Sequence, residues 1–477
     1  MHESHEDFQS GEEQQKEKQL ADDQSGLLST GSLDPMEDLE KLTQAQEGDS
    51  GDEWDTDLED NATRHRRSSS LSELYLQACK KIGVTPVSSF LRHLGESAAN
   101  LNHCGVGPLG AKALAIVLQN DNVITHLELE DNTLQADGTR YLMKMLRANV
   151  TIQSLNISEN HLGHQGAYII SKILLDNYCI KSIKLSGNDF DHSAAKYLAD
   201  ALMDDYVIKE LDLSHNKLCD IGGEYLGRML ARNQGIEVLD LSWNHFRVHG
   251  ALSAGLKVNS ILKQFHLSHN DFGHIGAESL GQALKQNNTL VLLDLSNNWL
   301  DDEAVTLLCQ GLSTNGTLKV LNLANNPMTN TGALVLLKTV KNNTRSAMEK
   351  IDISRVFVRE TFVELLEETR QTRPALEVQY DVMNSVTRNL SAIHIFKKHL
   401  EEQNQSITDF FRDLDKEETT KVSSSAFRKA AKEANIPLDQ RQIEWLITRF
   451  DKNCTAGINY RLVCEFADNF FISLRSL

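Results

Sequence analysis

Apolar residues recur along the middle of the chain with a fixed period. A pattern of two leucines flanking one residue, then an asparagine and a further apolar residue, begins at Leu211 and returns at Leu239, twenty-eight residues later. The alternation at its start predicts a short strand. Leucine pairs four apart, such as Leu226 with Leu230, predict a following helix with one apolar stripe. A single unit of this kind cannot bury its apolar face alone, so the pattern predicts units stacked side by side.

The period extends over nine units. Eight predicted strands are spaced by 28 residues, except for one step of 26, and they start at Ile124, Ile152, Ile180, Ile208, Ile236, Leu262, Leu290 and Leu318. The asparagine of the pattern recurs in the same eight units as Asn132, Asn160, Asn188, Asn216, Asn244, Asn270, Asn298 and Asn326. Cys104 stands one period upstream of the first asparagine and marks the ninth unit.

Two further positions recur within the predicted helices. A small residue is expected where each helix packs closely on its neighbour, at Gly110, Gly138, Gly166, Ala194, Gly222, Gly250, Gly276, Ala304 and Gly332. A second asparagine recurs near the helix ends, at Asn149, Asn177, Asn233, Asn259, Asn287, Asn315 and Asn343. Because asparagine tolerates the left-handed conformation, this second series predicts left-handed caps at the helix ends.

The ends of the array depart from the pattern, as terminal repeats that cap a stack do. Residues 71–95 predict two short helices, interrupted near Gly83 and Pro86, that cover the open first unit. At the other end Val356 replaces the asparagine, and residues 376–380 form the last candidate strand. The predicted stack therefore spans residues 96–381.

Residues 382–477 predict a small all-α domain. After a long helix to about Glu402, two helix-loop-helix segments resemble EF-hands, with loops that start 36 residues apart and Val422 and Ile458 at position eight of each loop. The bidentate glutamate that calcium needs at position twelve is replaced by Ala426 and Leu462. We therefore expect no calcium, no other cofactor and no dedicated metal site, with these weak candidate ligands: Asp415, Glu417, Asp451 and Asn453.

The first 70 residues are predicted to be a disordered acidic leader. Residues 1–61 hold 20 acidic residues against three lysines, which accounts for about −17 of the formal net charge of −19. Arg66 and Arg67 precede a serine run in which Ser69 is a candidate phosphorylation site. A solvated basic patch beside an acidic tail is the alternative explanation of this run.

The remaining composition excludes several classes. The seven cysteines are an odd number without Cys-x-x-Cys pairs, and the N-terminal residues have no apolar signal region, so we expect reduced thiols and a cytoplasmic location. No apolar run is long enough for a membrane helix. Outside the leader the chain is nearly neutral, and no basic excess indicates nucleic-acid binding. We expect a monomer that binds neither membranes nor nucleic acids.

The strand phase identifies the candidate interaction surface. Leucines at positions four and six of each unit point inward, so positions three, five and seven face out of the sheet. Position five carries several carboxylates, and position seven is mostly serine, which we expect to leave that row open. Histidines and tryptophans follow at the strand ends. The predicted protein-binding residues are Asp212, His215, Asp240, Trp243, His266, His269, Asp294, Trp299 and Asn322.

Exposed tryptophan beside histidine and carboxylate is typical of binding hot spots. In the alternative interpretation, the tryptophans cover the asparagine row and the histidines are surface spacers. The sequence shows no nucleophile elbow, His-Glu-x-x-His motif or glycine-rich phosphate loop, so we expect no enzymatic activity.

The 28-residue units with full helices resemble the ribonuclease-inhibitor class of leucine-rich repeats. The resemblance implies an α/β solenoid, a horseshoe with parallel strands on its concave face and helices on its convex face. It also implies a scaffold that binds a protein partner on the concave face. A calcium-responsive adaptor acting through the tail and a GTPase-activating protein similar to the Ran-specific type are the alternatives.

Overall fold

The computed structural model describes residues 71–247, 250–382, 384–415, 419–451 and 457–460. The acidic leader and the candidate phosphorylation site Ser69 lie outside the described residues, as do Glu417 and Asn453. The first described element is helix α4 (Leu71–Ile82), and the last is strand β13 (Gly457–Asn459).

One parallel sheet of 11 strands runs through the repeats in strict sequence order, from β1 to β11. Its strands are β1 (Ala98–Asn100), β2 (His126–Glu128), β3 (Ser154–Asn156), β4 (Ser182–Lys184), β5 (Glu210–Asp212), β6 (Val238–Asp240), β7 (Gln264–His266), β8 (Leu292–Asp294), β9 (Val320–Asn322), β10 (Lys350–Val358) and β11 (Glu377–Val382). In-register pairing between neighbouring repeats, such as Asp212 with Asp240, confirms the period. The predicted α/β solenoid is therefore correct.

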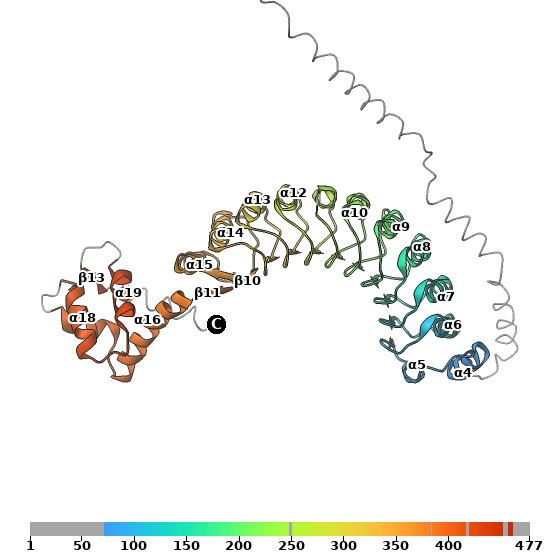
Figure 1. Cartoon of the computed structure of the whole chain (residues 1–477), viewed down its shortest axis with the longest axis horizontal. Coiled ribbons are helices and arrows are strands. Elements are labelled where there is room, and N and C mark those ends of the chain that lie inside the picture. The colour runs from blue at the N-terminus through green and yellow to red at the C-terminus, as the bar shows by residue number, and fades with distance from the viewer. Residues whose placement is uncertain (1–70, 248–249, 383, 416–418, 452–456, 461–477) are drawn as a thin grey trace, which may run out of the picture. The chain divides into compact units, whose positions relative to one another are not determined.

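A helix follows each of the first ten strands and packs on the helices of the neighbouring repeats. These helices are α6 (Gly107–Leu118), α7 (Gln135–Ala148), α8 (Gly163–Leu174), α9 (His192–Leu202), α10 (Asp220–Arg232), α11 (Gly250–Val258), α12 (His274–Leu284), α13 (Asp302–Leu312), α14 (Asn330–Asn342) and α15 (Glu360–Thr372). The repeats form an arc in which the helices lie on the outer side and the strands on the inner side (Figure 1).

The core lies between sheet and helices. Leu211 and Leu213, at positions four and six, are buried, and so are the helix leucines Leu226 and Leu230. Adjacent helices approach most closely at glycine: a Cβ placed on Gly311 of α13 would lie 2.0 Å from the backbone oxygen of Gly281 on α12. Gly281 and Gly311 do not belong to the series of small residues that the sequence pattern predicted at the contacts between helices.

The first asparagine row joins each repeat to its predecessor. Asn216 accepts hydrogen bonds at Oδ1 from the backbone N–H groups of Asn188 and Phe190, both at 3.0 Å. Its Nδ2 donates to the carbonyl of Leu185 in that same preceding repeat at 3.1 Å. Asn216 is buried, as are its counterparts in the neighbouring repeats. Because buried backbone groups need partners, this row supplies them where the chain leaves the strand.

The second asparagine row also bonds each repeat to its predecessor, here at the helix ends. The predicted left-handed caps are wrong. Asn149 has an extended backbone, with φ −79° and ψ 126°. Its Oδ1 accepts from the N–H groups of Thr151 and Ile152, and its Nδ2 donates to the carbonyls of Leu118 and Asp121 in the preceding repeat. The side chain, rather than an unusual backbone, is therefore what the position requires.

Two short helices cover the first repeat, α4 and α5 (Ser88–His93). Their rings meet edge to face at Tyr75 and Phe90, with centroids 4.7 Å apart, and both side chains are buried. Helix α4 packs on α6 of the first repeat. The first repeat thus has a covered end, as a stack of this kind needs.

The C-terminal segment is helical and has its own apolar core, which includes Phe396, Phe411, Phe427 and Phe450. Its helices are α16 (Asn384–Glu402), α17 (Ile407–Leu414), α18 (Ser424–Glu433) and α19 (Gln440–Phe450). Strand β12 (Lys421–Ser423) pairs antiparallel with β13.

Val422 lies directly opposite Ile458 in this pair, as paired EF-hand loops would place them. The EF-hand assignment itself stays a prediction. Trp445 of α19 donates from Nε1 to the Glu360 carboxylate of α15 at 3.0 Å, which joins this segment to the last repeat helix.

Candidate functional site

The residue just before each asparagine of the first row adopts the left-handed conformation throughout the array. His215, Trp243 and His269 have φ angles of 54°, 56° and 52°. The same position carries residues of very different chemistry with the same backbone: His103, Asp131, Glu159, Gly187, Asn297 and Asn325. The conformation is therefore a property of the loop, and the fold does not require an aromatic side chain there.

Three of these side chains form a ring column, which we define as His215, Trp243 and His269. The ring centroids of His215 and Trp243 are 5.0 Å apart with the planes inclined by 17°, and those of Trp243 and His269 are 3.6 Å apart with an inclination of 12°. Trp243 is 48% exposed. A bulky residue with positive φ is uncommon because its Cβ crowds the backbone, so this exposed indole is held at a conformational cost.

The predicted carboxylates at position five lie side by side on the sheet. Asp212 on β5 pairs in register with Asp240 on β6, Asp240 with His266 on β7, His266 with Asp294 on β8, and Asp294 with Asn322 on β9. We call these five residues the concave row. All five are partly exposed. The structure therefore brings together the five predicted site residues that share this position.

The aspartates of the concave row also close the turns at the strand ends. The Oδ1 atoms of Asp212, Asp240 and Asp294 accept hydrogen bonds from the backbone N–H groups two residues later, at 2.8–2.9 Å. Asparagine does the same in other repeats, at Asn156 and Asn322. One oxygen of each carboxylate thus closes a turn, and this structural role does not require the negative charge.

The serines at position seven do not leave an open row, because most of them are buried: Ser158, Ser214, Ser242 and Ser296. Their backbone N–H groups donate the turn hydrogen bonds that the side chains at position five accept. The expectation of an open serine row is therefore wrong, and the accessible part of the concave face lies at positions three, five and eight.

Carboxylates elsewhere in the repeats pair with cations of the neighbouring repeat. Examples with N–O distances of 2.6–2.8 Å are Lys217 with Asp189, Arg232 with Asp204, Lys263 with Glu237, Lys319 with Glu349 and Lys341 with Glu368. Among the described residues, no lysine or arginine forms such a pair with Asp212, Asp240 or Asp294. Lys184 is the cross-strand neighbour of Asp212, so Asp240 and Asp294 are the aspartates of the concave row without a neighbouring lysine or arginine on the adjacent described strands.

Two groups in this region have shifted pKa values. Burial raises the pKa of the Asp240 carboxyl, and the negative charge of Asp212 raises it further against the hydrogen bonds from Ser242 and the influence of His266. Burial lowers the pKa of His269, and the nearby His215 lowers it as well, against the attraction of Asp294. The ring column therefore favours a neutral imidazole at His269.

A shallow hollow of about 170 Å³ lies on the concave side beside these carboxylates. Lys184, Glu210, Asp212, Asp240 and His266 are among the residues that line it, together with apolar atoms of Val238. Trp299, the second predicted anchor, lies two repeats beyond Trp243 and is 66% exposed. It occupies the position after the asparagine row and is separate from the ring column.

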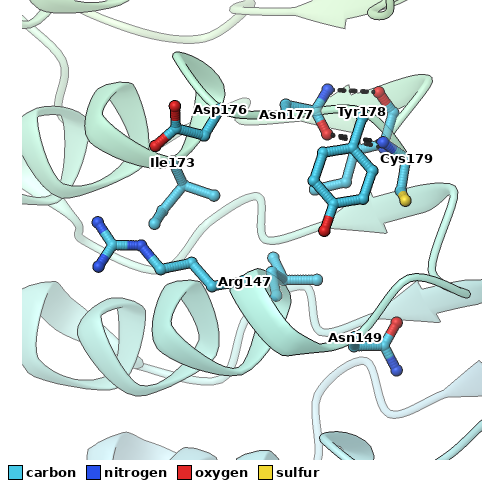
Figure 2. A pocket seen from close by; sticks show the side chains of 9 residues that line it. Arg147, Asn149, Ile173, Asp176, Asn177, Tyr178 and Cys179 are labelled. Carbon is cyan, nitrogen blue, oxygen red and sulfur yellow. Dashed lines mark hydrogen bonds between the residues drawn. The ribbon is translucent and has the colours of Figure 1, made fainter.

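A second hollow, of about 70 Å³, lies where helices α7 and α8 end (Figure 2). Figure 2 shows Asn177 closing the turn there, with Nδ2 donating to the Ile180 carbonyl and Oδ1 accepting from the Cys179 N–H. Tyr178 and Arg147 stand beside it. Sequence reasoning did not single out this edge.

The tail candidates for a metal behave as structural groups where they are described. Asp415 is buried, and its carboxylate accepts hydrogen bonds from the N–H groups of Thr419 and Thr420 and from the Tyr460 hydroxyl. Burial raises the pKa of Asp415, but these hydrogen bonds outweigh it and the net pKa is lowered. Asp451 is buried as well. Within the described ranges, no three histidine, cysteine or acidic side chains gather as a metal site would require.

None of the helices in the described residues has the length and apolarity of a membrane span.

The comparisons with known proteins agree with the repeat architecture. The family described as "Leucine Rich repeat" matches residues 100–115, 148–170, 207–227, 258–281, 286–309 and 314–337. Leucine-rich repeat-containing protein 74B of Homo sapiens is 36% identical over 112 residues, which is 24% of this chain and 25% of that protein. The Mus musculus protein of the same name is 46% identical over 54 residues, 11% of this chain and 14% of that protein. The matched segments thus span a quarter or less of these relatives.

Solved structures are similar only at a distance. The actin-binding site 2 of leiomodin-1 is 18% identical with a TM-score of 0.26, and it covers 37% of this chain and 88% of its own. An internalin from Listeria monocytogenes is 12% identical with a TM-score of 0.33, and it covers 67% of this chain and 99% of its own. The order of leader, cap, nine repeats and helical tail also resembles leucine-rich repeat-containing proteins 74A and 74B, and the sequence matches support this type.

Proposed function

We propose that this leucine-rich repeat protein is a non-catalytic scaffold that binds a protein partner on the concave face of its repeats. The binding surface extends from Asp212 to Asn322 and is centred on Trp243 and Trp299. Leucine-rich repeat proteins commonly mediate protein–protein interaction, which supports the general class. Cytoplasmic location, a monomeric state and the absence of enzymatic activity belong to the same proposal.

The observation that carries the proposal is the exposed indole of Trp243 in a left-handed position. Three other repeats fill this position with glycine or asparagine, which adopt the conformation at lower cost, at Gly187, Asn297 and Asn325. An aromatic side chain that the fold does not need, half exposed in a repeat whose strand carries a carboxylate of the concave row, is the composition of an interface hot spot.

The experiment is site-specific photocrosslinking in the full-length chain. A photoreactive phenylalanine analogue replaces His266 on the concave face, and in a matched control it replaces the exposed Lys285 at the end of α12 on the outer side. We expect a defined protein adduct from His266 alone. The adduct should disappear when Trp243→Asn and Trp299→Ala are added.

Equal adducts from both positions, or a concave adduct that ignores both tryptophan substitutions, would place the binding surface elsewhere. Repeating the reaction with calcium and with a chelator addresses the calcium-responsive adaptor. The calcium-responsive adaptor requires an adduct that forms with calcium and is lost with the chelator. The hydrogen bonds that the Asp415 carboxylate accepts within the tail do not favour this alternative.

A further inference from the structure

The ring column presents three stacked flat rings, one of which, Trp243, is half exposed. Its three rings are nearly parallel, and the next position toward the N-terminus is Gly187, which has no side chain of its own. The Glu159 carboxylate occupies the space above that glycine, since a Cβ on Gly187 would lie 1.9 Å from Glu159 Oε1. A stack of rings therefore has a carboxylate beyond its first imidazole, His215.

The concave row places further negative charge along the same strands. Asp212 has Lys184 as its cross-strand neighbour, but no lysine or arginine of the described chain forms an ion pair with Asp240 or Asp294, whereas carboxylates at the edges of the repeats are paired. The aspartates also have a fold role that asparagine fulfils equally well at Asn156 and Asn322. Their charge is therefore available to a partner.

The spacing of these charges fits an extended segment. Asp240 and Asp294 lie two strands apart, which corresponds to about 10 Å for parallel neighbours. An extended chain in the polyproline II conformation has three residues per turn and advances about 3.1 Å per residue, so every third side chain points the same way at intervals of about 9 Å. Cationic side chains at that interval match Asp240 and Asp294.

We infer that the partner segment is arginine-bearing and extended, with its guanidinium groups stacking on the ring column and pairing with Asp240 and Asp294. Arginine fits better than lysine because the guanidinium is planar, stacks on aromatic faces and pairs with carboxylates through two N–H groups. The inference rests on the proposed concave-face function and names the chemistry of its partner.

The test uses the full-length chain and three defined peptides of nine residues. Each has the pattern Gly-X-Gly-Gly-X-Gly-Gly-X-Gly, in which X is arginine, lysine or the neutral isostere citrulline. Binding is followed at the indole N–H of Trp243 by NMR of chain labelled at tryptophan, with the signal assigned through Trp243→Asn. We expect the arginine peptide to shift this signal and to bind about threefold more tightly than the lysine peptide. The citrulline peptide should bind roughly tenfold more weakly than the arginine peptide.

Charge variants test the concave row. Asp240→Asn with Asp294→Asn keeps the turn hydrogen bonds and should weaken the arginine peptide by about tenfold. The matched control, Glu224→Gln with Glu278→Gln, removes two charges from exposed helix positions and should change the affinity less than twofold. The acidic residues of the leader are the same in every variant, so any binding to them cancels in the comparison.

Equal affinities for arginine and citrulline, or equal losses in the two double variants, would overturn the inference. Such a result leaves the photocrosslink from His266 intact if the scaffold proposal is correct and only the partner chemistry is wrong. A missing photocrosslink together with an arginine-specific shift at Trp243 would instead reject the protein-partner proposal.

Discussion

The indole of Trp243 lies flat against the imidazole of His269, with the ring centroids 3.6 Å apart and the planes inclined by 12°. The two residues are 26 positions apart, because the repeat between them is the one that is two residues short. His215 lies 28 positions before Trp243, and its ring is farther away, at 5.0 Å. The closest contact in the ring column thus falls at the short repeat.

Replacing Trp243 by asparagine should leave the stability of the repeats nearly unchanged. Asparagine relieves a left-handed cost of about 1 kcal/mol but loses ring stacking of about 0.5–1.5 kcal/mol. We expect urea denaturation to give the variant a free energy of unfolding within about 1 kcal/mol of the wild-type value. The matched control is Asn297→Trp, which places an indole at the same position two repeats on. A large loss in Trp243→Asn would show that the column holds the repeats together.

His269 should titrate below the ordinary histidine range. Its pKa is lowered by burial and by His215. The neutral form is thus favoured in the folded chain, and the stability it contributes is fully present above about pH 6.5 and is lost as pH falls through the lowered pKa. Histidine NMR signals in wild-type chain and in His215→Asn should show the midpoint of His269 rising toward the ordinary value in the variant. A midpoint above about 6.5 in the wild type would contradict this.

The second asparagine row should matter far more than its exposed neighbours. Asn287 is buried, donates to the carbonyls of Leu256 and Asn259, and accepts from two backbone N–H groups. Asn287→Ala leaves these groups without partners and should destabilise by about 3 kcal/mol. Asn288→Ala changes an exposed side chain and should stay within about 0.5 kcal/mol. Thermal unfolding of the two variants side by side is the measurement.

Asp205 occupies the position of the second asparagine row in its repeat, and we expect Asp205→Asn to stabilise the folded chain. Its Oδ1 accepts from the N–H groups of Val207 and Ile208, and burial raises its pKa. An amide keeps these bonds and adds a donor toward the preceding repeat, which should stabilise by about 1 kcal/mol at pH 7.

The raised pKa means that the charged carboxyl weakens the fold above that pKa, and that this penalty fades as pH falls toward 3.8. The advantage of Asp205→Asn should therefore be larger at pH 7 than at pH 4.5. An advantage that grew on acidification would contradict the assignment.

Calcium should not change the stability of the tail. Position twelve of the first loop is Ala426, and the position-one carboxylate of Asp415 already accepts bonds from Thr419, Thr420 and Tyr460. A ligand that binds only the folded state raises the melting temperature, so we expect equal melting temperatures with 1 mM calcium (roughly the affinity of extracellular calcium modules) and with a chelator. A rise with calcium but not with magnesium would restore the calcium-responsive adaptor.

The sequence determined the sheet and its registration well, because burial of Leu211, Leu213 and their counterparts depends only on their spacing. It determined the helix ends poorly. Asn149 carries both a backbone preference and a side chain that bonds to the preceding repeat, and spacing alone does not separate the two. The structure shows that the side-chain bonds decide.

The candidate site was predictable as a set of residues but not as an arrangement. Asp212 and Asp240 follow from the strand phase. The ring column depends on a left-handed backbone at position eight, and no single residue type marks that position. Gly187, Asn297 and Asn325 at the same place were the signal available, since these are the residues that favour positive φ.

The two asparagine rows bond each repeat mainly to the one before it, as Asn216 does with Asn188 and Leu185. Energetic coupling in such an array is short-ranged, so a disturbance in one repeat is felt mainly by its immediate neighbours. A signal that starts at the tail must cross several such junctions before it reaches Trp243. We therefore expect regulation of the concave surface to depend on groups in the repeats around it.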